Sequence, residues 1–156
     1  MPKQPFSWFD PRRVVRIYRG NLLHWRQNDG LYFVTFRLAK SVLHFHRERW
    51  LVGDFVIMPN HVHLLAVSIN GYELEKVLYS VKRFSDRKIN ETVDRSGRFW
   101  QKEYYDRIVR DRAELYRIRK YISDNPGKAG VQPDGYMFRL AGWLNDVTES
   151  SQRILK

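Results

Sequence analysis

Residues 54–68 read DFVIMPNHVHLLAVS, and this stretch decides the fold. Two runs rich in apolar and β-branched residues, 54–58 and 61–68, flank a Pro-Asn pair, which has the chemistry of a turn. The pattern therefore predicts two strands that pair as an antiparallel hairpin. Because side chains alternate along a strand, the imidazoles of His61 and His63 are expected on the same face of the second strand.

Further strands are expected on both sides of this hairpin. Residues 31–38 are dense in β-branched and aromatic side chains and follow an Asp-Gly pair, as a buried strand does after a turn. Residues 105–110 have the composition of a last, short strand.

Helices are expected between and after the strands. Apolar residues recur every three or four positions over 71–91, which predicts an amphipathic helix, and Asn70 with Glu73 has the spacing of a capping start. A second helix is expected over 111–125, from an Asp-x-x-Glu start to a Pro-Gly pair. Looser apolar spacing over 40–51 predicts a short crossover helix.

This order of elements predicts an α+β fold, with a ferredoxin-like antiparallel sheet and helices packed on one face. The length of 156 residues is that of one domain. Three segments are expected: a basic and aromatic N-terminal arm over 1–28, a compact domain over 29–130 and a C-terminal tail over 131–156.

The composition limits the classes of function. The 28 Lys and Arg against 17 Asp and Glu give a net charge of +11, and half of the basic residues lie between Lys76 and Lys120. Such a charge attracts polyanions, nucleic acid first, although an inert basic surface would have the same charge. The lack of cysteine excludes disulfides and thiolate metal sites. Because no apolar run approaches the ~20 residues of a membrane span, we expect a cytoplasmic protein without a membrane partner.

The first candidate site is the pair His61 and His63. Two imidazoles on one face of a rigid strand can bind one divalent cation. A metal site normally needs more than two ligands, so the alternative is a pair of half-exposed strand histidines without a metal.

The second candidate site lies on the last expected helix. Tyr121 and Asn125 are four residues apart and Arg117 lies one turn earlier, so the three side chains share one helix face. A phenol is a poor nucleophile in water, but it becomes competent when a divalent ion polarises the electrophile. Periodicity alone favours the alternative that Tyr121 is a packing residue.

Basic and aromatic side chains make up a candidate nucleic-acid-binding set. The aromatic cluster over 99–105 is flanked by basic residues and suits stacking on unpaired bases, although some of its rings must close the end of the sheet. The outer face of the helix over 71–91 is partly basic, and it either follows a phosphate backbone or is simply solvated. The candidate residues are Arg83, Arg87, Arg98, Trp100, Lys102, Arg107, Arg110 and Arg117.

Four stretches together carry a resemblance to a known family. They are YFVTFRL at 32–38, MPNHVHL at 58–64, FWQKEYYDRIVRD at 99–111 and YISDNPGKAG at 121–130. In order and spacing they resemble the REP-associated tyrosine transposases, which belong to the His-hydrophobic-His single-strand nucleases. The resemblance covers roughly residues 20–135.

The resemblance implies a single-tyrosine transposase domain over 29–130, which is a metal-dependent endonuclease and strand transferase on single-stranded hairpin DNA of the REP type. Tyr121 would be the nucleophile that forms a 5′-phosphotyrosine link and releases a 3′-hydroxyl. His61 and His63 would bind Mg²⁺ or Mn²⁺, and Asn125 matches the third ligand position. The resemblance implies no nucleotide cofactor, and a monomer, although some members of the wider superfamily are dimers.

Two alternatives remain open. One is a catalytically inactive, domesticated protein that binds hairpin DNA, because residues 39–53 form a shorter link than the family usually has before its His strand. The other is an RNA-binding protein, because residues 30–36 partly match the aromatic strand of RNA-recognition modules. That strand lacks the leading basic residue, so Phe33 and Phe36 are interpreted as core side chains.

Overall fold

The computed structural model describes residues 4–19, 22–36, 45–98, 104–145 and 147. No helix within these ranges has both the length and the apolar character that crossing a bilayer requires. Two short 3-10 turns, Pro133–Gly135 and Gly142–Leu144, flank the last strand. The other elements, in chain order, are β1 (Arg16–Arg19), β2 (Leu23–Arg26), β3 (Tyr32–Phe36), β4 (Trp50–Ile57), β5 (Val62–Ser68), α1 (Leu74–Val93), β6 (Tyr105–Ile108), α2 (Arg112–Lys128) and β7 (Met137–Arg139).

Within the described residues, one sheet has the strand order β6-β3-β5-β4-β7, and every neighbouring pair is antiparallel. β4 and β5 form the expected hairpin, with Ile57 opposite Val62 and Trp50 opposite Ser68. β5 lies between β3 and β4, and β6 joins beside β3, which is the ferredoxin-like order. The predicted α+β class and antiparallel sheet are therefore confirmed.

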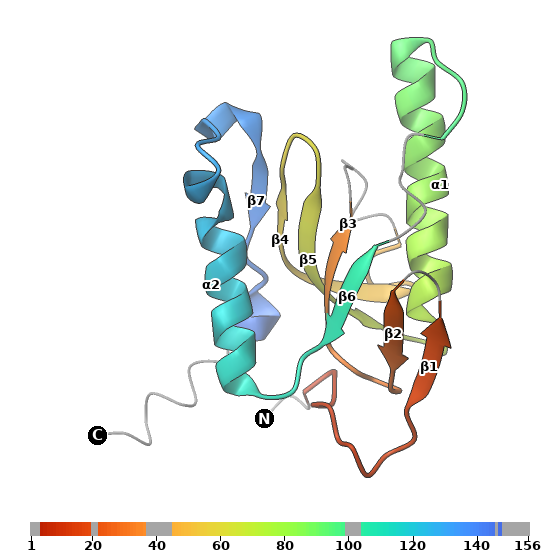
Figure 1. Ribbon diagram of the computed structural model, residues 1–156, viewed down its shortest axis with the longest axis vertical. Coiled ribbons are helices and arrows are strands. Elements are labelled where there is room, and N and C mark those ends of the chain that lie inside the picture. Colours follow the sequence, from red (N-terminus) through yellow and green to blue (C-terminus); the bar gives the residue numbers. More distant parts are fainter. Residues whose placement is uncertain (1–3, 20–21, 37–44, 99–103, 146, 148–156) are drawn as a thin grey trace.

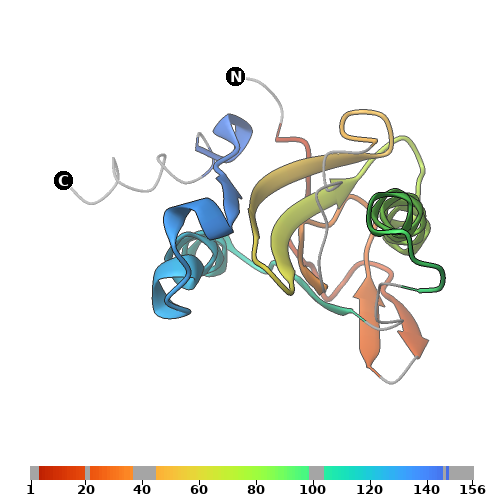
Figure 2. The ribbon, with the colours of Figure 1, turned by 90° about the horizontal axis from the view of Figure 1, so that it is seen from above.

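The central strand β5 is buried on both faces of the sheet. Val62, Leu64 and Ala66 point to one face, and Leu65 and Val67 point to the other. α1 covers the first face and α2 covers the second, so that the sheet lies between the two helices in both views (Figures 1 and 2). The buried helix side chains are Leu74, Val77, Leu78 and Val81 from α1 and Leu115, Ile118 and Ile122 from α2.

The prediction that the helices pack on one face is thus wrong in this detail. A strand that is apolar on both faces needs a cover on each, and two helices on the same face would leave the other face of β5 in water.

Residues 45–51 do not form the expected crossover helix. Phe45 and Arg47 have φ values of 62° and 66°, in the left-handed region that a right-handed helix excludes. The backbone N–H of Arg47 donates to the carbonyl of Trp50 over 2.8 Å. Trp50 is fully buried as the first residue of β4. Residues 40–44 of the expected helix lie outside the described residues.

Both long helices are confirmed, but the start of α1 differs from the prediction. α1 begins after Glu73, which makes no side-chain capping hydrogen bond. Asn70 lies three residues before this N-cap position, and its side-chain amide instead donates to the backbone carbonyl of Glu48 over 2.8 Å. α2 starts as expected, because the carboxylate of Asp111 accepts from the backbone N–H of Glu114 over 2.7 Å.

α2 continues past its expected end at Asn125 and reaches Lys128. Pro126 has no N–H to donate to the preceding turn. The helix still adds a turn, because the backbone N–H of Ala129 donates to the carbonyl of Asn125 over 3.0 Å.

The N-terminal arm, expected to be irregular, contains the hairpin β1–β2. Leu23 and Trp25 are exposed on β2, whereas His24 and Arg26 are buried. The strand pattern is therefore present, but polar side chains occupy its buried positions. Because the apolar side chains are exposed and the polar ones are buried, the hydrophobic pattern did not predict this strand.

The C-terminal tail, expected to lack a regular element, adds β7 to the edge of β4. Asp54 on β4 is fully buried and holds this segment in place. Its carboxylate accepts from the backbone N–H of Ala141 over 2.8 Å and from Nε of Arg119 on α2 over 2.6 Å. Arg119 also donates to the carbonyl of Leu144 over 3.1 Å. One buried ion pair therefore joins β4, α2 and the C-terminal segment.

Replacing Asp54 with Ala should lower the free energy of unfolding by about 3 kcal/mol, because it leaves the Arg119 guanidinium without its buried partner. Urea denaturation followed by circular dichroism measures this loss. Glu48→Ala is the matched control: its pair with Arg49 is exposed, and its removal should change stability far less. Equal losses in the two variants would contradict a structural role for the Asp54 pair.

Candidate active site

His63 lies on β5, which pairs with β3, and its side chain is on the face of the sheet that α2 covers. The residue is 6% exposed. Its Nδ1 is 2.8 Å from the hydroxyl oxygen of Thr35, the residue directly opposite on β3. Its ring stacks on Phe33, with centroids 5.7 Å apart. These contacts hold the ring in one orientation.

His61 precedes β5 and lies beside His63, with ring centroids 4.6 Å apart. Its Nδ1 is 2.5 Å from the side-chain oxygen of Asn60. Because an amide oxygen only accepts hydrogen bonds, Nδ1 of His61 is the protonated nitrogen and Nε2 carries the lone pair. This is the form of imidazole that can bind a cation through Nε2.

Tyr121 projects from α2 toward the histidine pair. Its hydroxyl is 3.4 Å from Nε2 of His63, and the two rings are 5.1 Å apart. The ring also meets Phe33 edge-on, with centroids 6.0 Å apart. The side chain is 42% exposed, so the phenol is supported on one side and open to solvent on the other.

Asn125 and Arg117 flank Tyr121 along α2. Asn125 is half-buried one turn after Tyr121, and Arg117 is exposed one turn before it. Ile118 and Ile122 on the same helix are buried, as the spacing predicts. The helix therefore presents an amide, a phenol and a guanidinium along the side that is not buried in the core.

The surroundings of His63 keep its imidazole neutral. Burial, together with the charge of the nearby His61, lowers the pKa of His63 to about 4. A neutral imidazole retains a lone pair at physiological pH, which a protonated one lacks.

Three of the candidate arginines gather on the same face as Tyr121. Arg107 on β6 is half-exposed and pairs with Glu114 on α2 over 2.5 Å. Arg110, in the loop between these two elements, and Arg117 are both exposed. This face of the sheet therefore carries positive charge beside the tyrosine.

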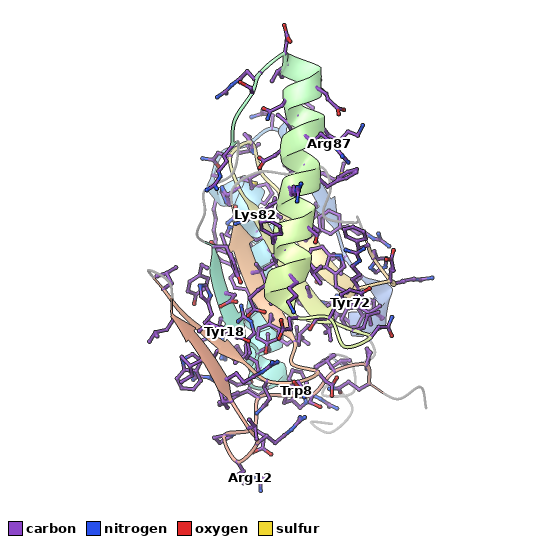
Figure 3. The ribbon with its side chains drawn as sticks, turned by 90° about the vertical axis from the view of Figure 1, so that its right-hand side faces the viewer. Trp8, Arg12, Tyr18, Tyr72, Lys82 and Arg87 are labelled. Carbon is purple, nitrogen blue, oxygen red and sulfur yellow. The ribbon has the colours of Figure 1, made fainter. Side chains whose placement is uncertain are left out.

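The other candidates lie elsewhere. Arg83 and Arg87 are on α1, which covers the opposite face of the sheet; Figure 3 shows Arg87 from that side. Arg98 is exposed beyond the end of α1. Trp100 and Lys102 lie outside the described residues. The candidate set is therefore divided between two sides of the molecule.

A model of the family described as "Transposase IS200 like" matches residues 38–125, more than half of the chain. The chain belongs to the IS200-like transposase family. The matched range includes His61, His63 and Tyr121, and its last residue is Asn125.

The chain is also similar to a curated protein and to a solved structure. An uncharacterized protein of Haemophilus influenzae is 30% identical over 100 residues, which cover 48% of this chain and 53% of that protein. The chain thus spans about half the length of this curated relative. A REP-associated tyrosine transposase bound to a REP hairpin matches with a TM-score of 0.52 and 19% identity, over 72% of this chain and 73% of the other. This likeness shows a shared fold.

Two site residues of the transposase escaped the sequence analysis. Thr35 had no motif to mark it, because its contact with His63 depends on the register of β3 against β5. Phe33 was interpreted as a core side chain, yet it is half-buried between His63 and Tyr121. The alternation over 31–38 places both on one face, but only the strand pairing shows what they contact.

The stability of the transposase should fall as pH decreases from 6.5 to about 4 when no metal is bound. In this range the unfolded chain binds a proton at His63 and the folded chain does not, so acid favours unfolding by up to about 3 kcal/mol. Urea denaturation in EDTA at several pH values measures this dependence. His63→Gln should lack this part of the loss, and an unchanged pH dependence in the variant would contradict the lowered pKa.

Proposed function

We propose that this transposase is a metal-dependent single-stranded DNA endonuclease and strand transferase, which acts on hairpin DNA through a 5′-phosphotyrosine intermediate. The observation that carries the proposal is the Tyr121 hydroxyl 3.4 Å from Nε2 of His63, with His61 alongside. A potential nucleophile thus lies beside two potential metal ligands. All three residues fall within the range that the transposase family model matches.

The side chains at this site fit a divalent metal ion. Nδ1 of each histidine has an oxygen partner, so Nε2 is the ring nitrogen through which His61 and His63 would bind a cation. Among the described residues, no group of three or more His, Cys, Asp and Glu side chains is placed to hold a metal ion. We propose the amide oxygen of Asn125 as the third protein ligand, because the family resemblance implies this position and Asn125 lies one turn after Tyr121 on α2. Bound Mg²⁺ or Mn²⁺ would supply a Lewis acid for the phosphate.

The proposed reaction exchanges one phosphodiester for another. The Tyr121 phenol loses its proton to solvent, and its oxygen forms a bond to phosphorus while the bond from phosphorus to the 3′ oxygen breaks. The leaving oxygen takes up a proton as a 3′-hydroxyl, and the phosphate remains on Tyr121 as a 5′ diester. Because a diester is retained, no nucleotide cofactor is needed. Attack by a 3′-hydroxyl on this diester reverses the step and joins strands.

Hairpin DNA is the proposed substrate. The solved transposase with the same fold is bound to a REP hairpin. The net charge of +11, with Arg117 exposed one turn before Tyr121 and Arg110 exposed just before α2 begins, favours a polyanion at this face. Phosphate contacts position the strand, so these arginines would place a phosphodiester near the phenol.

Tyr121→Phe should abolish the covalent protein–DNA adduct and leave binding within about two-fold, because it removes the nucleophilic oxygen and keeps the ring. The measurement uses end-labelled hairpin DNA from the flanks of the gene, with Mn²⁺ or with EDTA, on a denaturing gel. Tyr116→Phe is the control, since Tyr116 is exposed elsewhere on α2 and should keep the metal-dependent band.

The outcomes separate the open alternatives. Wild-type cleavage in Tyr121→Phe would assign the nucleophile to another tyrosine, such as Tyr105, or to water. Tight hairpin binding by the wild-type protein without any adduct would support the catalytically inactive DNA-binding alternative.

Thr35→Val should weaken Mn²⁺ binding about 10- to 100-fold, because it removes the oxygen that contacts Nδ1 of His63 and orients the ring. Free Mn²⁺ measured by electron paramagnetic resonance gives the affinity without reference to cleavage. Thr35→Ser keeps the hydroxyl and should bind close to the wild-type affinity. Equal affinity in the Val and Ser variants would show that this hydroxyl does not prepare the site.

A further inference from the structure

A groove of about 250 Å³ lies where the hairpin β1–β2 meets the edge strand β6. Trp25 and Tyr105 are 45% and 47% exposed in it, and Leu23 is 56% exposed. Phe9 supports the indole from one side, with ring centroids 6.0 Å apart. The groove therefore presents two large aromatic rings to solvent. Its lining residues are Phe9, Leu23, Trp25, Tyr105, Asp106, Arg107, Ile108 and Arg110.

Buried charges on the other side of β2 fix the position of Trp25. Arg26 forms ion pairs with Asp106 on β6 and with Glu75 on α1. His24 is 3.0 Å from the same Asp106 carboxylate, which is 2% exposed. Because strand neighbours point to opposite sides, these anchors hold Trp25 outward at the edge of β6. They also neutralise the buried carboxylate of Asp106, a residue that lines the groove.

The groove lies next to the candidate active site. Tyr105 and Thr35 are paired in register, so their side chains lie on the face that bears His63. The ring of Phe33 is 6.4 Å from that of Tyr105 and 6.0 Å from that of Tyr121. One aromatic ring therefore separates the groove from the proposed nucleophile.

The charge of the groove complements a phosphate backbone. Arg107 and Arg110 line it, and Arg107 is partly compensated by Glu114. Within the described residues no carboxylate pairs with the exposed Arg110 guanidinium. Exposed rings with an adjoining unpaired cation are the combination that binds single-stranded nucleic acid by base stacking.

We propose that this groove binds an unpaired base of the DNA strand beside the scissile phosphate, by stacking on Trp25 and Tyr105. The inference rests on the proposed function, since it takes the DNA strand to pass Tyr121. Trp25 lies outside residues 38–125, which the family model matches, so this stacking residue is contributed by the N-terminal hairpin of the chain. Because stacking tolerates every base, the groove would hold the strand in place without reading a sequence.

The test measures fluorescence anisotropy in EDTA with two probes. Both are fluorescein-labelled DNA hairpins with six-nucleotide single-stranded flanks, made of thymidines in one and of abasic sites in the other. The phosphates are the same, so the difference reports base stacking. The wild-type protein should bind the thymidine probe at least about ten-fold more tightly. Trp25→Ala and Tyr105→Ala should each remove most of this preference and leave the abasic probe unchanged.

Two variants serve as controls for this test. Trp25→Phe keeps a stacking ring and should retain part of the preference. Tyr116→Ala removes an exposed ring of α2 that does not line the groove and should retain all of the preference. Thermal unfolding checks that each variant is folded. If Trp25→Ala is not folded, the Trp25→Phe variant and the two wild-type affinities test the inference instead.

Equal wild-type affinities for the two probes would overturn the inference, as would a Trp25→Ala variant with an undiminished preference. These results would leave the proposed function intact if the metal-dependent adduct forms at Tyr121. Failure of the wild-type protein to bind either hairpin would instead reject the proposed function, and the stacking groove with it.

Discussion

The burial of apolar side chains on both faces of β5 is the constraint on which the rest of the structure depends. A central strand of this kind cannot be stable with one face in water, since each Å² of apolar surface that is buried contributes about 25 cal/mol. α1 and α2 satisfy one face each. His63 occupies the same row of β5 as Leu65 and Val67, which α2 covers. The alternation that builds the core therefore also directs an imidazole toward the helix that carries Tyr121.

Local periodicity was sufficient to predict the β4–β5 hairpin, both long helices and the last strand of the ferredoxin-like order, because each has its own apolar pattern. It was insufficient where contacts between residues far apart in the sequence determine the structure. The hairpin β1–β2 escaped prediction because its buried positions hold His24 and Arg26, which are stabilised by Asp106, a residue far along the chain. The pairing of Thr35 with His63 depends on strand register, and the spacing of residues within either strand does not contain that information.

Segments outside the range that the family model matches lie along both edges of the sheet. β7 pairs with β4 at one edge, and the hairpin β1–β2 contacts β6 at the other. An uncovered edge strand is a template for pairing with another chain, so these additions limit aggregation as well as completing the fold. The two additions differ in character, because β7 continues the hydrogen-bonded ladder, whereas β2 is held through the side chains of Arg26 and His24.

The ion pair of Asp54 with Arg119 also has a bearing on how the molecule opens. Arg119 lies two residues before Tyr121 on α2, and the same buried carboxylate binds the backbone of Ala141. The C-terminal segment is therefore not an appendage that frays independently. It shares a buried ion pair with β4 and with the helix that carries Tyr121, so we expect local opening of the segment to displace the proposed nucleophile as well.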